Sequence, residues 1–342
     1  MNPDDERMHP VRAEPAWSES YYFNFVDPDS KLAMFTRMGF RPGDGWADGL
    51  HVVYLGGQRV AFTYGRRAIG GDLTQYDGDL CVGGLRLECM DPFGSWRISY
   101  DGDAQDIADA AIMLERSKLR PAGWFRPAHL RMAVEFAGLF PPHYAGQGAR
   151  GHFEQTGRVH GDIALDGVTH RVSGYGVRDK SWGPRDWGAN QGGAATAAAA
   201  AGPAAAAVAA APADAAPAPF VNWFSMNFGA GLAMGGACGR AADGAMRGTG
   251  WIQRDGITEN LVDVLIETVY RPASILHTQI RLTGKVASGR AVVVDGSMLT
   301  VCPTKIPMPG GATFVNEGLA ELRCDGLTGY GISEHWHMVR GA

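Results

Sequence analysis

The chain has 342 residues, of which 45% are hydrophobic and 10% aromatic, so it can bury the cores of one or two domains, and two is the expected number. Its net charge of −5 argues against the strongly basic surface that nucleic-acid binding or a polybasic membrane anchor needs. The scattered cysteines include no Cys-x-x-Cys pair, which argues against a disulfide framework or a zinc site and indicates a reducing compartment: Cys81, Cys89, Cys238, Cys302 and Cys324.

The first 14 residues are charged and contain no apolar core, so we do not expect a signal peptide. Apart from an alanine-rich tract, no apolar run approaches the ~20 residues of a membrane-spanning helix. We therefore predict a cytoplasmic protein with no integral membrane segment and no nucleic-acid partner. The sequence leaves its oligomeric state open.

Strand-like segments separated by glycine and proline turns fill the first half of the chain. In the first segment, 17–25, Tyr21, Phe23 and Phe25 share one face and Tyr22 and Asn24 the other. Only residues 103–118 have the composition of a helix. The remaining strands are expected at 32–40, 51–55, 59–64, 80–90, 95–100, 129–136, 152–165 and 168–175, with Asp-Gly turns at 101–102 and 166–167.

Residues 189–219 form a low-complexity segment, with 18 alanines among positions 194–218 and several prolines that would break a helix. We interpret it as a flexible linker or insertion between a first β domain, 1–188, and a second, 220–342. The second domain repeats the pattern of short strands and Asp-Gly turns, the turns being expected at 255–256, 295–296 and 325–326. The predicted fold class is therefore all-β, with two antiparallel barrels or sandwiches in tandem and few short helices.

Two similar segments lie 155 residues apart. The first reads Gly-Tyr-Gly-Val-Arg-Asp at 174–179, and the second reads Gly-Tyr-Gly-Ile-Ser-Glu at 329–334. Each follows an Asp-Gly turn, at 166–167 and at 325–326. The alignment places Glu334 on Asp179 and predicts two similar domains, each ending in a strand that carries a carboxylate.

The first of these segments carries a resemblance to a known family. The run Tyr-Gly-Val-Arg-Asp-Lys-Ser-Trp-Gly-Pro-Arg-Asp-Trp at 175–187 resembles the Arg-Asp-His-Ser-Trp-Gly signature of bacterial proteins built from two lipocalin-like barrels, most of which have no assigned reaction. It is more distantly similar to a motif of carotenoid 1,2-hydratases and kievitone hydratases. Lys180 stands where the commoner pattern has His, and Ser181 stands where the hydratases have Asn. The resemblance implies two lipocalin-like barrels and a hydrophobic small-molecule substrate.

Hydration of an isoprenoid-type double bond needs a protonated carboxylic acid in an apolar pocket and aromatic faces beside the developing cation. We predict Asp179 as this acid and Glu334 as a second catalytic carboxylate. Arg178 and Lys180 should point away from Asp179, because neighbours on a strand face opposite sides. The predicted substrate-binding residues are Tyr175, Trp182, Trp187, Arg185, Glu19 and Tyr22.

The predicted function is that of a hydratase, dehydratase or isomerase acting on a terpenoid, steroid or prenylated compound without a cofactor. The alternatives are a carrier that binds such a compound without chemistry, and a structural module. In those readings Asp179 forms an ion pair with Arg185 or Lys180. We expect no metal site, because His335 and His337 have no third ligand at a suitable spacing. No phosphate-binding loop is expected either, since the Gly-x-Gly-x-x-Gly match at 146–151 leads into a strand.

Overall fold

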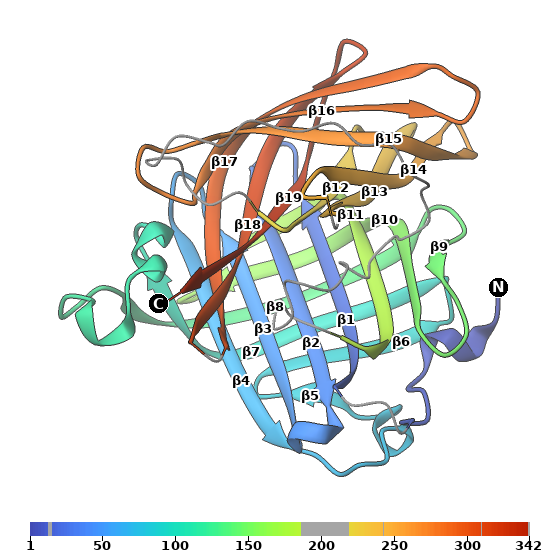
Figure 1. Cartoon of the computed structure of the whole chain (residues 1–342). Helices are drawn as coiled ribbons and strands as arrows, with labels where there is room; N and C mark the ends of the chain where they lie inside the picture. The colour runs from blue at the N-terminus through green and yellow to red at the C-terminus, as the bar shows by residue number, and fades with distance from the viewer. Residues whose placement is uncertain (13–15, 186–218, 242, 309, 341–342) are drawn as a thin grey trace. The chain divides into compact units, whose positions relative to one another are not determined.

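The computed structural model describes residues 1–12, 16–185, 219–241, 243–308 and 310–340 (Figure 1). Strands make up most of the described chain and its helices are all short 3-10 turns, which confirms the predicted all-β class. It divides into two compact units. Unit 1 contains residues 1–109 and the chain from 121 to its last described residue, 185, and unit 2 contains residues 110–120 and the described chain from 219 onward. Nearly all of the predicted alanine-rich linker lies outside the described residues.

Unit 1 is an eleven-stranded antiparallel sheet whose central path runs in the order β4-β3-β2-β1-β11-β10-β8-β7-β6-β5, with β9 beside β10. An additional pairing of β4 with β7 joins the path into a ring of eight strands. The strands are β1 (Trp17–Val26), β2 (Ala33–Arg41), β3 (Trp46–Tyr54), β4 (Val60–Ala68), β5 (Leu80–Val82), β6 (Leu85–Asp91), β7 (Ser95–Ile107), β8 (Arg126–Gly138), β9 (His143–Gly146), β10 (Gly151–Leu165) and β11 (Val168–Pro184). Three short 3-10 helices accompany them, η1 (Pro3–Glu6), η2 (Pro42–Asp44) and η3 (Thr74–Tyr76).

Alternation along β1 assigns the two faces of this sheet. Tyr21, Phe23 and Phe25 belong to the main hydrophobic core of unit 1, as their spacing predicts. Tyr22 and Asn24 point to the other face and are buried as well. Both faces of β1 are therefore buried, which explains why this strand has so few exposed polar positions.

Unit 2 is a closed barrel of eight antiparallel strands in sequential order. Its interior is filled by apolar residues such as Phe224, Met234 and Leu282. The strands are β12 (Val221–Asn227), β13 (Leu232–Arg240), β14 (Met246–Arg254), β15 (Ile257–Tyr270), β16 (His277–Val286), β17 (Ala291–Met308), β18 (Gly311–Cys324) and β19 (Leu327–Arg340).

The predicted helix at 103–118 is wrong. β7 continues to Ile107, because its residues pair in register with β8 and Asp106 accepts hydrogen bonds from Arg59 and Arg126 at 2.7 Å each. Only two 3-10 helices follow, η4 (Ala110–Leu114) and η5 (Ser117–Leu119). Tertiary pairing thus overrides the local helical composition.

The Asp-Gly dipeptides have two different roles. Asp166-Gly167 and Asp325-Gly326 have positive φ at both residues, which is the geometry of a tight two-residue hairpin turn, as predicted. Asp101-Gly102 and Asp295-Gly296 lie inside β7 and β17, so the turns predicted there are wrong. No helix in the described part of the chain has the length and apolarity to cross a membrane.

Candidate functional site

Three polar side chains line up across adjacent strands of unit 1. Tyr22 on β1 lies directly opposite Asp179 on β11, and Asp179 lies directly opposite Glu154 on β10. All three point to the face of the sheet away from the main core, because Arg178 and Phe23 next to them point inward. We call this row the unit 1 acid row.

Asp179 is the least buried member of the row and is incompletely paired. Its side chain is 17% exposed, and its Oδ1 atom has no hydrogen-bond partner among the described residues. His152 approaches it, with Nδ1 at 3.9 Å from Oδ1, and the other ring nitrogen of His152 lies 3.1 Å from Glu154 Oε1. The imidazole therefore stands between two carboxyl groups.

The pKa values of this pair follow from that geometry. Burial raises the pKa of Asp179, although the positive charges of His152 and Arg185 act in the opposite direction. Burial by itself would lower the pKa of His152, but Asp179 and Glu154 outweigh it, so the His152 pKa is raised. An acid with a raised pKa is thus placed beside a base that can hold a proton.

An aromatic row continues from the acid row on the same face of the sheet. The Tyr22 ring lies 6.3 Å from the Phe35 ring, and Phe35 lies 6.0 Å from Tyr54, measured between centroids. All three are buried. Asn24 is buried beside them, and its Oδ1 accepts a hydrogen bond from the Val177 amide at 3.1 Å. Asp179 therefore has an aromatic surface on one side and the His152–Glu154 pair on the other.

Arg178 and Lys180 point into the core of unit 1. Lys180 forms a buried ion pair with Glu19, which also accepts hydrogen bonds from the His9 backbone and lies 2.8 Å from His9 Nδ1. Burial acts to raise the pKa of Glu19, but the charges of Lys180 and His9 prevail and that pKa is lowered. Glu19 is therefore an ionised partner of Lys180 on the face opposite to Asp179.

The other predicted binding residues of unit 1 are dispersed. Trp182 is on the core face, where its ring stacks on His9 at 4.0 Å. Tyr175 shares the face of Asp179 but lies four residues away along β11, and Arg158 Nη2 donates to its hydroxyl at 3.1 Å. Arg185 donates to Ser181 Oγ at 2.9 Å. Trp187 lies outside the described residues.

Glu334 occupies in unit 2 the position that Asp179 has in unit 1. Trp223 on β12 lies opposite Glu334 on β19, and Glu334 lies opposite Glu317 on β18. An aromatic residue and two acids therefore recur in the same strand order, and we call this set the unit 2 acid row. Glu334 also accepts a hydrogen bond from the indole of Trp336.

The residue after each acid faces the interior of its unit. In unit 2 this residue is His335, which stacks on His277 with 3.9 Å between ring centroids and lies near His337 at 6.3 Å. Burial lowers the pKa of His277 to about 3 and that of His335 well below its usual value, so both rings are neutral. In the chain as described, no group of His, Cys, Asp or Glu side chains is arranged to hold a metal ion.

Sequence reasoning missed His152 and Glu154 as site residues. The signal was present, because the tight turn at 166–167 fixes the register of the hairpin that contains them. Glu154 lies twelve residues before Asp166 and Asp179 lies twelve residues after Gly167, so the two must pair. The second hairpin follows the same rule. Glu317 lies eight residues before Asp325 and Glu334 lies eight residues after Gly326, so these two also pair.

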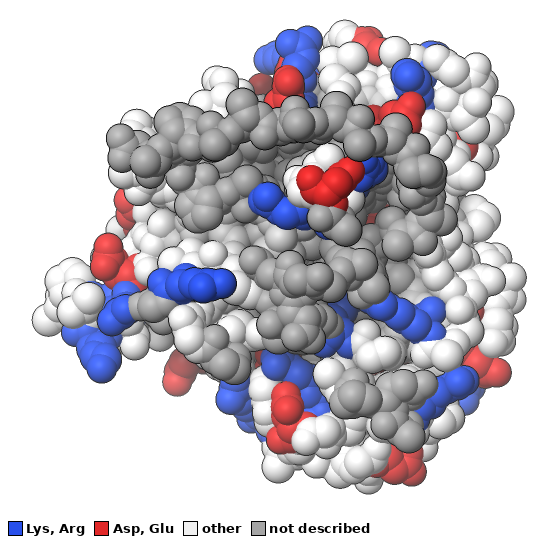
Figure 2. Space-filling view, viewed as in Figure 1, with Lys and Arg blue, Asp and Glu red and all other residues white. Residues whose placement is uncertain are grey.

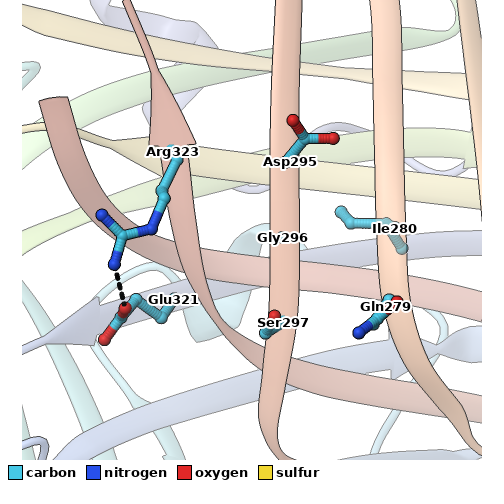
Figure 3. Close-up of a pocket in the computed structure, with 7 residues that line it drawn as sticks. All are labelled: Gln279, Ile280, Asp295, Gly296, Ser297, Glu321 and Arg323. Atoms are coloured by element: carbon cyan, nitrogen blue, oxygen red, sulfur yellow. Dashed lines mark hydrogen bonds and ion pairs between the residues drawn. The ribbon is translucent and has the colours of Figure 1, made fainter. Parts of the chain in front are cut away.

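A separate hollow of about 290 Å³ lies on β16, β17 and β18 of unit 2 (Figure 3). Its lining is mostly polar and includes the ion pair of Arg323 with Glu321 at 3.3 Å. Figure 2 shows basic and acidic side chains scattered among uncharged ones over one face of the molecule. The hollow does not match the chemistry of a hydrophobic ligand.

Comparisons with known proteins agree with this fold. The model of a domain of unknown function, DUF7064, matches residues 2–339. No curated protein matches the sequence. The crystal structure of a Nitrosomonas europaea protein provisionally assigned as AttH has a TM-score of 0.59 at 14% identity, covering 96% of this chain and 98% of that one. The structure of CghA with Sch210972 has a TM-score of 0.53 at 12% identity, covering 96% and 90%, and that of CghA alone has 0.52 at 12%, with the same coverage. At these identities the likeness shows a shared fold.

Proposed function

We propose that this chain, which belongs to the DUF7064 family, binds a hydrophobic small molecule and protonates a carbon–carbon double bond in it, with Asp179 as the acid. The observation that carries the proposal is the environment of Asp179. Burial raises its pKa, Oδ1 lacks a hydrogen-bond partner in the described part of the chain, and the aromatic row begins at Tyr22 directly opposite. The structure of CghA with Sch210972 supports it by analogy, since a protein of similar fold was solved together with that compound.

The chemistry follows from the positions of three groups. In the form of the pair in which Asp179 carries the proton and His152 is neutral, Asp179 gives its proton to one alkene carbon, and the π electrons of the double bond form the new carbon–hydrogen bond. The cation left on the other carbon is stabilised by the face of Tyr22 and by the Asp179 carboxylate. Water then adds to that carbon while His152, oriented by Glu154, accepts its proton, and the product is an alcohol. Transfer of this proton from His152 to Asp179 restores the starting pair. Loss of a neighbouring proton in place of water addition gives an isomer.

Carriage without chemistry is the second candidate function. It is favoured by the 3.9 Å approach of His152 Nδ1 to Asp179, because a charged imidazole there holds the carboxylate in its ionised form. A carrier would bind the ligand with the aromatic row, and the ion pair of His152 with Asp179 would have a structural role only.

The experiment begins with native mass spectrometry and solvent extraction of the purified protein, which identify a co-purified hydrophobic compound. Turnover of that compound and of its unsaturated or hydrated counterparts is then compared between the wild type and Asp179→Asn. The proposal requires the variant to bind the compound but not convert it. Normal turnover by Asp179→Asn would show that the acid is another residue. Binding with no turnover by either protein would establish the carrier.

A further inference from the structure

The N-terminal arm, residues 1–12, contributes a buried carboxylate to the core of unit 1. Glu6 receives two hydrogen bonds from the Arg178 guanidinium, at 2.8 Å and 2.5 Å, and a third from the Phe93 amide at 2.7 Å. Gln155 accepts from Arg178 Nε at 2.7 Å. Both charged side chains are at most 2% exposed. Arg178 is therefore held by a carboxylate that comes from outside the sheet.

The surroundings of this ion pair are aromatic. The guanidinium carbon of Arg178 lies 5.1 Å from the centre of the Phe153 ring, 5.8 Å from Trp96 and 5.9 Å from Phe93. Such a site combines a fixed cation with apolar walls, which is the complement of a hydrophobic molecule that ends in a carboxylate.

The arm itself has this chemistry. Only two of its side chains are buried, and they are the carboxylate of Glu6 and the apolar side chain of Met8. Met8 belongs to the same hydrophobic core as Trp96 and Phe153. The arm contains a single turn of 3-10 helix and forms no strand of its own, and the amides of Met8 and His9 donate to the side chains of Asp77 and Glu19. Lys180, the other buried cation on this face, has its counter-charge within the sheet, because its partner Glu19 is part of β1.

A second polar group in this core is unsatisfied. His51 is fully buried, and neither of its ring nitrogens has a hydrogen-bond partner among the described residues. It lies on the same level of the sheet as Arg178, since Arg178 pairs with Phe23, Phe23 with Thr36 and Thr36 with His51 across successive strands. Burial lowers the pKa of His51 to about 3, so the ring is neutral. The ring stacks on Tyr100 at 5.4 Å between centroids, but its two nitrogens are free to bond a polar group of a bound molecule.

We propose that the core side of unit 1 is a binding site for a hydrophobic carboxylate, and that Glu6 and Met8 of the arm occupy it in place of the ligand. A buried arginine without a counter-charge is strongly unfavourable, so the arm leaves only when another carboxylate takes over the bidentate pairing with Arg178. The tail of the ligand then fills the space of Met8, and a polar group along it can satisfy His51. This site lies on the face opposite to Asp179 and is separate from the proposed reaction.

The test uses the full chain and sodium decanoate as the probe, with 1-decanol as the uncharged control. Binding is measured by titration calorimetry and thermal shift. Because a tethered carboxylate competes at an effective concentration of about a millimolar or more, Glu6→Ala should bind decanoate on the order of tenfold more tightly than the wild type. Decanol should show no such gain. The matched variant is Glu6→Met with Arg178→Met, which replaces the ion pair by apolar groups and should lose the preference for decanoate over decanol.

Equal decanoate binding by Glu6→Ala and by the double variant would overturn the proposal, and so would no binding by Glu6→Ala. If Glu6→Ala does not fold alone, the variant is refolded in the presence of decanoate or of decanol, and the comparison of the two refolding yields tests the proposal. Recovery of the near-ultraviolet circular dichroism spectrum with decanoate only supports the site. Equal recovery with both compounds, or recovery with neither, contradicts it.

Discussion

Units 1 and 2 place an acid at the same position and surround it differently. In both, the last strand carries the acid opposite an aromatic residue of the first strand and opposite a second acid, so the two acid rows match. In unit 1 the next residue inward is Lys180, paired with Glu19, whereas in unit 2 it is the neutral His335, stacked on His277. On the acid side, Asp179 faces His152, and Glu334 accepts a hydrogen bond from the Trp336 indole. The comparison teaches that the two units share the position of the acid while its chemistry is set locally.

The largest expected effect is on turnover. If the acid of unit 1 alone transfers the proton, Asp179→Asn should reduce turnover of the co-purified compound by about 10²- to 10⁴-fold, the usual contribution of general acid catalysis. Glu334→Gln is the matched change in unit 2 and should reduce turnover by less than about tenfold on the same basis. Single-turnover kinetics on both variants measure the difference. Equal losses would show that turnover depends on Glu334 as much as on Asp179.

The next effect is on stability and compares the residues that follow the two acids. Lys180→Met leaves the buried Glu19 without its main counter-charge and should destabilise unit 1 by about 3–5 kcal/mol. His335→Leu removes a neutral ring whose contacts are 3.3 Å hydrogen bonds to Tyr270 and Ser333, and should cost about 1–3 kcal/mol. Urea unfolding followed by circular dichroism gives both values.

The control for Lys180→Met is Glu19→Met with Lys180→Met. Because it removes both charges, most of the stability lost in the single variant should return. A double variant as unstable as the single one would show that packing, and not the unpaired carboxylate, accounts for the loss.

Acid should destabilise unit 2 through its buried histidines. His277 has a pKa of about 3 in the folded state against about 6.5 in an unfolded chain, so the unfolded state binds more protons between these values. Unit 2 should therefore lose stability as the pH falls from about 6.5 towards 3. His277→Gln should flatten this dependence, measured as the urea midpoint between pH 7 and pH 4. An unchanged slope would show that another group titrates.

The sequence contained much of this comparison. Alternating apolar residues and the turns at 166–167 and 325–326 were sufficient to predict an all-β chain with a repeated acid-bearing strand, and the same turns determine the partners of Asp179 and Glu334. The pairing of Glu6 with Arg178 could not be predicted, because it joins residues 172 positions apart through an arm with no strand pattern. Asp101-Gly102 and Asp295-Gly296 misled the prediction, since a turn dipeptide also fits a strand when its neighbours pair on both sides.

The smallest expected effect is on the free energy of unfolding, which the burial of a charged Asp179 lowers at neutral and alkaline pH. The pKa of Asp179 is raised on folding, so the folded state binds its proton more tightly than the unfolded state does. The resulting stabilisation is complete below the unfolded pKa of about 3.9 and is lost as the pH rises through the folded pKa. Asp179→Asn has no charge to bury, so it should be slightly more stable than the wild type at pH 8 and should lose this advantage near pH 3.5. Thermal melts at the two pH values measure the difference, with Asp162→Asn, an exposed position on β10, as the control. A variant less stable than the wild type at pH 8 would mean that the charged Asp179 is favourably paired with His152 and would favour the carrier over the acid catalyst.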